Sequence, residues 1–394
     1  MNTFEQSEAL QRLPEQFFAK LVKKVHKMKK QGHDIINLGQ GNPDLPTPPH
    51  IVEELQKASE NPKYHKYSPF QGYPFLKEAV AEFYKREYGV DIDPEKEIAV
   101  LFGAKTGLVE ISQCLLNSGD LALLPDPGYP DYMSGIALAN AKTEFMPLLK
   151  ENDFLPDYQK ISADSMEEAK LMFLNYPNNP TSATATKSFF DETVNLAKEN
   201  NICVVHDFAY GALGFDGQKP QSFLQSKGAK DIGVEIYTLS KTYNMAGWRV
   251  GFAIGNQSVI NSINLIQDHL YVSLFGAVQH AAAKALTSSQ EAVQQLVDTY
   301  QSRRDRFIQK LNEIGWEVEA PKGTFFVWLP VPSGYTSEEL ANVLLEEAHV
   351  MTAPGHGFGA SGEGYLRVGL LDDEDRLEEA VRRIEKLQLF MKEK

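Results

Sequence analysis

Short apolar runs recur through the middle of the chain, and stretches with helical spacing separate them. Runs such as ICVV and LMFL have no polar face, which favours strands that are buried on both sides of a sheet. Segments such as FLKEAVAEFYKREYG and SFFDETVNLAKENN are amphipathic and predict helices. Strands that alternate with helices predict an α/β fold with a mainly parallel sheet flanked by helices. The expected strands cover 98–103, 121–125, 171–177, 202–207, 234–240 and 250–256.

The two ends of the chain have a different pattern. FFAKLVKKVHKMKKQG predicts a helix, and the Pro- and Gly-rich NLGQGNPDLPTPPH after it should be irregular. Late in the chain, the polar helix QQLVDTYQSRRDRFIQKLNEIG leads to predicted strands at WEVEAP, TFFVWLP and YLRVGL, and EDRLEEAVRRIEKLQLFMKEK forms a last helix. We therefore predict a large domain over 51–290 and a smaller α+β domain over 291–394, to which the segment 1–50 contributes.

Composition narrows the possible functions. The 394 residues exceed one typical domain, which holds about 100–150. The 39 Lys and Arg against 53 Asp and Glu give a net charge of −14, which makes nucleic acid an unfavourable partner. No apolar run reaches about 18 residues, so we expect no membrane span. No secretory signal is visible, and Cys114 and Cys203 lie far apart as expected of free thiols, which predicts a cytoplasmic protein.

The strongest chemical signal is the segment TLSKTYNMAGWRVGF, which covers 238–252. Lys241 follows a predicted buried strand, and Arg249 follows on the same loop. Taken singly, a surface lysine and an ion-paired arginine are the simpler interpretations. Together, Ser240, Lys241 and Arg249 put a hydroxyl, an amine and a guanidinium around one loop. A phosphate can bind the hydroxyl and the guanidinium, which leaves the amine free to form a Schiff base.

This segment resembles the lysine-attachment motif of the class I/II pyridoxal-phosphate aminotransferases of fold type I. The resemblance implies pyridoxal 5'-phosphate as the cofactor and a seven-stranded sheet in the large domain. It implies Lys241 as the catalytic residue that holds the cofactor, with phosphate contacts from Ser240, Arg249 and Thr238. Thr238 stands where the family usually has Ser or Gly, and it keeps the hydroxyl.

Other segments resemble the family's cofactor motifs in the same order along the chain. In LFGAKTGLVEI, a small-residue turn precedes a helix, whose N-terminus favours anions; the resemblance assigns phosphate contacts to Ala104 and Lys105. In DPGYPDY, it places Tyr129 on the face of the cofactor ring and Tyr132 near the substrate. Two tyrosines in a Pro-rich loop are by themselves more typical of surface packing.

The ring of the cofactor has its own requirements. VVHDFAY resembles the segment whose aspartate, here Asp207, pairs with the ring nitrogen and whose tyrosine, here Tyr210, bonds the ring oxygen. By itself Asp207 could equally be a helix N-cap. NYPNNPTS is an ordinary turn composition, and it resembles the motif in which the asparagine, here Asn179, contacts the ring oxygen and the substrate carboxylate. Ser182 replaces the usual glycine of that motif.

The substrate and a partner subunit account for the remaining matches. In EGYLRVGLL, Arg367 matches the arginine that binds the substrate carboxylate in a two-pronged geometry. In GQGNPD, the backbone of Gly41 matches a glycine that closes over the same carboxylate. KYSPFQGYPFLKEAV resembles the segment whose tyrosine, here Tyr67, reaches the phosphate of the partner subunit. The resemblance therefore implies a homodimer.

Two other patterns in the sequence resemble binding motifs. GFGASG satisfies Gly-x-Gly-x-x-Gly, but a dinucleotide site needs a helix immediately after it, and EGYLRVGLL has the pattern of a strand. We expect a glycine loop there and no dinucleotide. The nine histidines show no HExxH motif or close pairing, so we expect no metal. His206 precedes Asp207 and is interpreted as supporting that carboxylate.

The resemblance implies transfer of an amino group between an L-amino acid and a 2-oxo acid, with the Lys241 amine moving the α-proton. HDFAYGALGFDG and GQGNPDLPTPPHI are most similar to the bacillus-type methionine-salvage group, a sister of the LL-diaminopimelate aminotransferases. That likeness implies conversion of 4-methylthio-2-oxobutanoate to methionine. Phe17 and Phe18 fall where relatives place residues near the substrate, although a helix packing face explains them as well. An aspartate, alanine or LL-diaminopimelate aminotransferase and a carbon–sulfur lyase are the alternatives.

Overall fold

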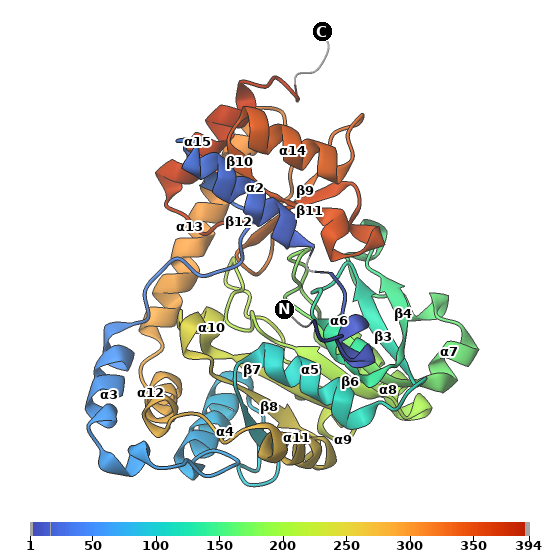
Figure 1. The fold of residues 1–394 in the computed structure, drawn as a ribbon, viewed down its shortest axis with the longest axis vertical. Helices are drawn as coiled ribbons and strands as arrows, with labels where there is room; N and C mark the ends of the chain where they lie inside the picture. The colour runs from blue at the N-terminus through green and yellow to red at the C-terminus, as the bar shows by residue number, and fades with distance from the viewer. Residues whose placement is uncertain (1–2, 16, 391–394) are drawn as a thin grey trace.

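A seven-stranded sheet forms the centre of the computed structural model, which describes residues 3–15 and 17–390 (Figure 1). The strand order is β2-β8-β7-β6-β5-β3-β4. Within this sheet β8 runs antiparallel to both of its neighbours, and the other pairs are parallel. The mainly parallel sheet predicted from the sequence is therefore confirmed. The strands are β2 (Ile98–Leu101), β3 (Leu121–Asp126), β4 (Lys142–Pro147), β5 (Ala169–Asn175), β6 (Cys203–Asp207), β7 (Gly233–Thr238) and β8 (Gly251–Gly255).

Helices cover both faces of this sheet, because the inner strands are apolar on both sides. In β2, Ile98 and Val100 belong to one hydrophobic cluster, whereas Ala99 and Leu101 belong to the other. The first cluster packs against α3 (Pro49–Ser59), α4 (Pro74–Tyr88), α8 (Lys187–Asn200) and α12 (Gly276–Thr287). The second packs against α5 (Ala104–Leu115), α6 (Tyr132–Ala139) and α11 (Gln257–Leu270). Short helices are α1 (Glu8–Gln11), α7 (Ala163–Glu168), α9 (Ala229–Ile232) and α10 (Leu239–Thr242).

All six strands predicted in the middle of the chain are present, but two details differ. The strand β4 was not predicted, because its KTEFMP sequence is largely polar and it lies exposed at the edge of the sheet. The segment WEVEAP was predicted to be a strand and is not one. Its apolar residues serve packing instead, since Trp316 stacks on Phe390 with ring centroids 4.3 Å apart.

The N-terminal and C-terminal segments share a second core, at the top of Figure 1. There β1 (Ile36–Asn37) pairs in parallel with β10 (Val350–Met351), and Ile36 and Leu38 pack among residues from 307–384. A three-stranded antiparallel sheet lies beside them, in the order β11 (Ala353–Pro354), β12 (Tyr365–Gly369) and β9 (Phe326–Pro330). The helices of this part are α2 (Phe18–Lys30), α13 (Glu291–Glu313), α14 (Ser337–Glu347) and α15 (Glu374–Glu385).

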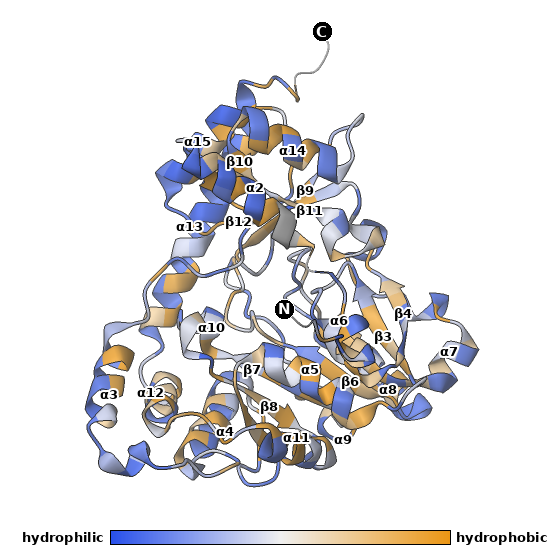
Figure 2. Cartoon of the chain, viewed as in Figure 1, coloured by the Kyte–Doolittle hydropathy of each residue, from blue (hydrophilic) through white to orange (hydrophobic). Residues whose placement is uncertain are grey.

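This arrangement agrees with a smaller α+β unit built from both ends of the chain, and the boundaries 1–50, 51–290 and 291–394 stay a prediction. Figure 2 shows that the central strands are mostly hydrophobic and that α15 is mostly hydrophilic. No helix in the described ranges is long and apolar enough to cross a membrane. Asn175, Asp207 and Thr238 end the parallel strands β5, β6 and β7 at one edge of the sheet. Parallel α/β sheets place their binding sites at this edge.

Candidate active site

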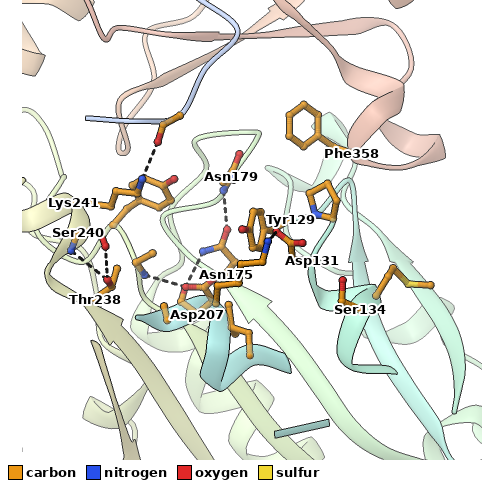
Figure 3. A pocket seen from close by; sticks show the side chains of 18 of the residues that line it. Tyr129, Asp131, Ser134, Asn175, Asn179, Asp207, Thr238, Ser240, Lys241 and Phe358 are labelled. Carbon is orange, nitrogen blue, oxygen red and sulfur yellow. Dashed lines mark hydrogen bonds and ion pairs between the residues drawn. The ribbon is translucent and has the colours of Figure 1, made fainter. Parts of the chain in front are cut away.

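A cavity of about 850 Å³ lies at this edge and is bordered by both parts of the molecule. The Lys241 amine projects into it from α10, and its Nζ donates a hydrogen bond of 2.8 Å to the backbone oxygen of Gly41 (Figure 3). Burial lowers the pKa of Lys241 to about 8, and the positive charges of Arg367 and Arg249 act in the same direction, opposed by Asp207. A neutral amine, which can act as a nucleophile or a base, is thus accessible near neutral pH.

Asp207 supplies the negative charge of the cavity. It ends β6 with 5% of its surface exposed, and its two carboxylate oxygens accept hydrogen bonds from the Tyr132 hydroxyl (2.9 Å) and the Ala209 amide (3.2 Å). Burial raises the pKa of Asp207, and the Tyr132 hydrogen bond opposes that shift. The imidazole of His206 contacts the buried Glu235, with 2.8 Å between Nδ1 and Oε2, and His206 also opposes the rise in the pKa of Asp207 through its charge interaction, as the sequence led us to expect. Asp207 is placed to hold a cationic ring nitrogen.

A cradle for an anion lies at the N-terminus of α5. The helix starts at Ala104 and has no side-chain cap, so backbone N–H groups of its first turn have no helical partner. Arg249 has a left-handed backbone (φ 56°) and lies against Gly103, where a Cβ would be 2.4 Å from its Nη2. Because Gly103 also has φ +81°, glycine is required at this point. The guanidinium and the helix N-terminus therefore meet at the cavity wall.

The hydroxyls predicted for the same anion lie around it. Ser240 lines the cavity, and Thr238 caps the short helix α10 by accepting from the Ser240 amide (3.2 Å). Thr238 also lines the cavity, and its hydroxyl donates to the backbone oxygen of Val250 (3.1 Å). Lys105 lines the cavity too, with its ammonium 2.9 Å from the carboxylate of Asp131. Its charge is therefore shared with a partner that the sequence did not indicate.

Arg367 forms the positive centre on the opposite wall. It lies on β12 with 7% of its surface exposed. The ring centroids of Phe326 and Phe358 lie 4.1 and 4.6 Å from its guanidinium carbon. Nη1 donates to Asn179 Oδ1 (2.8 Å) and Nη2 to the oxygen of Gly39 (3.1 Å). Nε is buried and has no partner in the described part of the chain. Burial lowers the pKa of Arg367 to about 10, so it stays charged at pH 7.

Asn179 is held in place by its own loop. The backbone N–H of Asn179 donates to Asn175 Oδ1 (2.8 Å), and Asn175 Nδ2 donates to the backbone oxygen of Asp207 (2.8 Å). Sequence reasoning did not select Asn175, although its position at a strand end inside NYPNNPTS was a usable signal. Ser182 has φ 63°, a conformation that favours glycine, and its hydroxyl donates to the oxygen of Phe326 (2.7 Å). The serine thus preserves the loop that positions Asn179.

The three tyrosines occupy different places. Tyr129 and Tyr210 line the cavity, and burial raises the pKa of each, so both hydroxyls stay neutral hydrogen-bond donors. Tyr132 was expected near the substrate, but it is 1% exposed and does not line the cavity. The reason is that α6 begins at Tyr132 and turns its side chain inward, where it stacks on Phe173 and bonds to Asp207.

Three further predictions concern Gly41, Tyr67 and the phenylalanine pair at 17 and 18. Gly41 lines the cavity, and a Cβ there would lie 3.1 Å from Phe326, so its backbone approaches closely. Tyr67 is 90% exposed and does not line the cavity of its own chain. Phe17 lines the cavity, whereas the side chain of Phe18 lies outside the described residues. Asp131 and Phe358 are among the further lining residues that the sequence did not indicate.

These groups fit a phosphorylated pyridine aldehyde. The uncapped helix with Arg249 suits a phosphate, the Asp207 carboxylate suits a ring nitrogen, and the Lys241 amine suits an aldehyde. The unpartnered Nε of Arg367 suits a second anion across the cavity. Among the described residues there is no group of three or more His, Cys, Asp or Glu that could hold a metal ion. GFGASG leads into the strand β12 rather than a helix, which removes the dinucleotide interpretation.

Comparisons with known proteins give a consistent result. Residues 33–384 match the model of the family described as aminotransferase class I and II. The L-glutamine--4-(methylsulfanyl)-2-oxobutanoate aminotransferase of Bacillus subtilis is 65% identical, over 98% of this chain and 97% of the relative. The LL-diaminopimelate aminotransferase of Moorella thermoacetica is 44% identical, over 97% and 98%. The structure of apo-BacF from Bacillus subtilis superposes with a TM-score of 0.95 at 52% identity, over 99% of each chain.

Proposed function

The chain belongs to the class I and II aminotransferases. We propose that it uses pyridoxal 5'-phosphate to convert 4-methylthio-2-oxobutanoate to methionine by transfer of an amino group. The observation that carries the proposal is one cavity that brings together the Lys241 amine, the Asp207 carboxylate and the Arg367 guanidinium. The high identity to a relative named for this oxo acid supports the choice of substrate.

The cofactor, when bound, supplies an aldehyde that takes up amino groups and a ring that withdraws electrons from the α-carbon. We assign its phosphate to the first turn of α5 at Ala104 and Lys105, and to the hydroxyls and guanidinium of Thr238, Ser240 and Arg249. We assign its ring to the polar groups on the floor of the cavity and to one aromatic face, which come from Asn179, Asp207, Tyr210 and Tyr129.

The side chains of this chain then perform the proton transfers. Lys241 Nζ takes the proton from the α-carbon of the amino donor and later returns one to the α-carbon of the acceptor. Its lowered pKa of about 8 leaves part of the amine neutral at physiological pH. Asp207 keeps negative charge next to the ring nitrogen, and the Tyr132 hydroxyl stabilises that charge at 2.9 Å. Tyr132 is thereby reassigned from the substrate to Asp207.

The substrate is held at both ends. We assign its carboxylate to Arg367, with Asn179 beside the guanidinium and the Gly41 backbone over it. The outer wall near Arg367 is aromatic, with Phe358 and Phe17 among the lining residues. An unbranched thioether side chain is apolar and flexible, which suits such a wall. A dicarboxylate would need a second cation there, and Lys105 is already paired with Asp131.

We also propose a homodimer in the cytoplasm. Tyr67 is 90% exposed on its own chain, and a second copy would give this side chain a phosphate to bind. The exposed Phe70 lies close to it in sequence, which supports contact with another apolar surface. Cys114 and Cys203 are free thiols, as a reducing compartment allows.

A steady-state survey of substrates tests the proposal. Purified protein loaded with pyridoxal phosphate is given 4-methylthio-2-oxobutanoate, oxaloacetate, pyruvate or 2-oxoglutarate, each with glutamine, aspartate, alanine or LL-diaminopimelate as the donor. We expect kcat/KM to be highest for 4-methylthio-2-oxobutanoate. If that oxo acid is among the poorest acceptors, one of the other aminotransferases is the better assignment. Release of pyruvate and ammonia from a sulfur amino acid without any acceptor would instead identify a lyase.

A further inference from the structure

A buried carboxylate outside the cavity joins the two parts of the molecule. Asp126 ends β3 with 6% of its surface exposed, and it does not line the cavity. Its oxygens accept the backbone N–H of Ser361 at 3.1 and 3.2 Å and the Ser361 hydroxyl at 3.1 Å. No lysine, arginine or histidine of the described ranges forms an ion pair with it. Asp126 therefore serves as an acceptor for one turn of the C-terminal part.

That turn is the glycine loop noted in the sequence, and it is fitted closely to the carboxylate. A Cβ on Gly359, which has φ +137°, would lie 1.9 Å from Asp126 Oδ1. A Cβ on Gly362 would lie 2.2 Å from the backbone oxygen of Gly355. Any side chain at either position would displace the turn from Asp126. The glycines of PGHGFGASGEG thus let the loop close onto this carboxylate.

The loop carries a wall of the substrate site. Phe358 lies in it, and its ring is 4.6 Å from the guanidinium carbon of Arg367. The oxygen of Phe358 accepts the N–H of Gly128 at 2.8 Å, next to the cavity residue Tyr129. Figure 3 shows Phe358 on the ribbon of the C-terminal part, across the cavity from Asp207. The position of the loop therefore fixes one aromatic face against Arg367.

We propose that Asp126 is a positioning residue for the substrate carboxylate. It anchors the turn at Ser361, the turn places Phe358 against the guanidinium, and the guanidinium of Arg367 is thereby held at the angle that a carboxylate requires. The inference rests on the proposed function, since it concerns the substrate of that same cavity. Asp126 thus contributes to substrate binding, and attachment of the cofactor to Lys241 does not depend on Asp126.

The test compares Asp126→Ala with Asp126→Asn in the holoenzyme. Loss of the hydrogen bonds in Asp126→Ala should raise KM about tenfold for both the amino acid and the oxo acid, with kcat within about twofold. Asparagine keeps one acceptor for the Ser361 N–H and offers a donor to the hydroxyl, so Asp126→Asn should restore KM to within about threefold. Ser361→Ala removes one bond of the set and should raise KM by about two- to threefold. The visible absorbance of the bound cofactor should match wild type in all three.

The controls distinguish a positioning role of Asp126 from a loss of protein stability and from an error in the proposed function. Asp216→Ala removes one of the two carboxylate partners of Arg304, away from the cavity, so it should lower the melting temperature and leave KM unchanged. Binding of 4-(methylthio)butanoate, a carboxylate with no reacting group, is measured on each variant by calorimetry. Its Kd should rise about tenfold in Asp126→Ala, whether or not the enzyme turns over the proposed substrates.

Unchanged KM and Kd in Asp126→Ala, or an equal rise in Asp216→Ala, would overturn the positioning role. Absence of methionine formation by wild type would overturn the proposed function alone. If Asp126→Ala does not fold, an unchanged KM and Kd in Ser361→Ala would refute the inference.

Discussion

Replacing Arg367 by lysine keeps a positive charge on β12 but removes the planar fork. In Arg367, Nη1 donates a hydrogen bond to Asn179 Oδ1 (2.8 Å), and Nη2 donates one to the backbone oxygen of Gly39 (3.1 Å). Its buried Nε has no hydrogen-bond partner in the described ranges. A lysine ammonium presents a single point of charge and cannot form two parallel bonds to a carboxylate. The substitution also removes the cation–π contacts of the guanidinium, whose carbon lies 4.1 and 4.6 Å from the ring centroids of Phe326 and Phe358.

The size of the effect follows from these contacts. Losing one hydrogen bond between charged groups costs about 1.5–3 kcal/mol, which corresponds to about 10- to 150-fold in kcat/KM. Because the carboxylate is bound both before and during proton transfer, most of the loss should appear as a higher KM. Arg367→Ala also leaves the substrate carboxylate unpaired in a buried site, and it should cost about 2–5 kcal/mol.

The assay is steady-state kinetics of Arg367→Lys with the amino donor and the oxo acid varied in turn. Arg303→Lys is the matched control, because Arg303 is equally buried (5% exposed), pairs with Asp44 and does not line the cavity. We expect KM for both substrates to rise in Arg367→Lys and to stay at the wild-type value in Arg303→Lys. A KM within about threefold of wild type in Arg367→Lys would refute the assignment of Arg367 to the carboxylate.

Three other changes address the cofactor side of the cavity. With the cofactor removed, the Lys241 amine should react half-maximally with acetic anhydride near pH 8 rather than near pH 10.5, because burial favours the neutral amine. Mass spectrometry of the labelled peptide across a range of pH measures this midpoint, and a midpoint near pH 10.5 would contradict the lowered pKa of Lys241. Gly103→Ala places a Cβ 2.4 Å from Arg249 and should weaken pyridoxal-phosphate binding about tenfold or more, measured by equilibrium titration; unaltered affinity would exclude Arg249 from the phosphate site. Tyr132→Phe removes a hydrogen bond to Asp207, so the pKa of that carboxyl should rise further and kcat should fall about tenfold with KM nearly unchanged; a change in KM alone would return Tyr132 to the substrate.

Much of the fold could be predicted from local pattern. Short apolar runs indicated β2, β3, β5, β6, β7 and β8, and runs such as ICVV and LMFL have no polar face because the inner strands of a covered sheet are apolar on both sides. The polar edge strand β4 gave no such signal. WEVEAP has alternation typical of a strand, but its tryptophan is buried by Phe390, a contact that no local pattern encodes.

The candidate site, too, could be predicted only in part from the sequence. Lys241, Asp207 and Arg367 were each indicated by a motif at the end of a strand or within one, and the structure brings all three to one cavity. Tyr132 was misplaced because sequence gives the residue but not the side of the helix that faces inward. The pairing of Lys105 with Asp131 depends on how two loops meet in space, so it could not be read from either segment.

Transfer of isotope label tests the central claim most directly. Wild-type holoenzyme is incubated with glutamine labelled with 15N at its α-amino group and with 4-methylthio-2-oxobutanoate, and the methionine formed is analysed by mass spectrometry. Lys77→Ala is the control for Lys241→Ala, since burial lowers the pKa of Lys77 as well and it lies outside the cavity. We predict labelled methionine from wild type and from Lys77→Ala, and none from Lys241→Ala. Labelled methionine from Lys241→Ala at the wild-type rate would contradict the account.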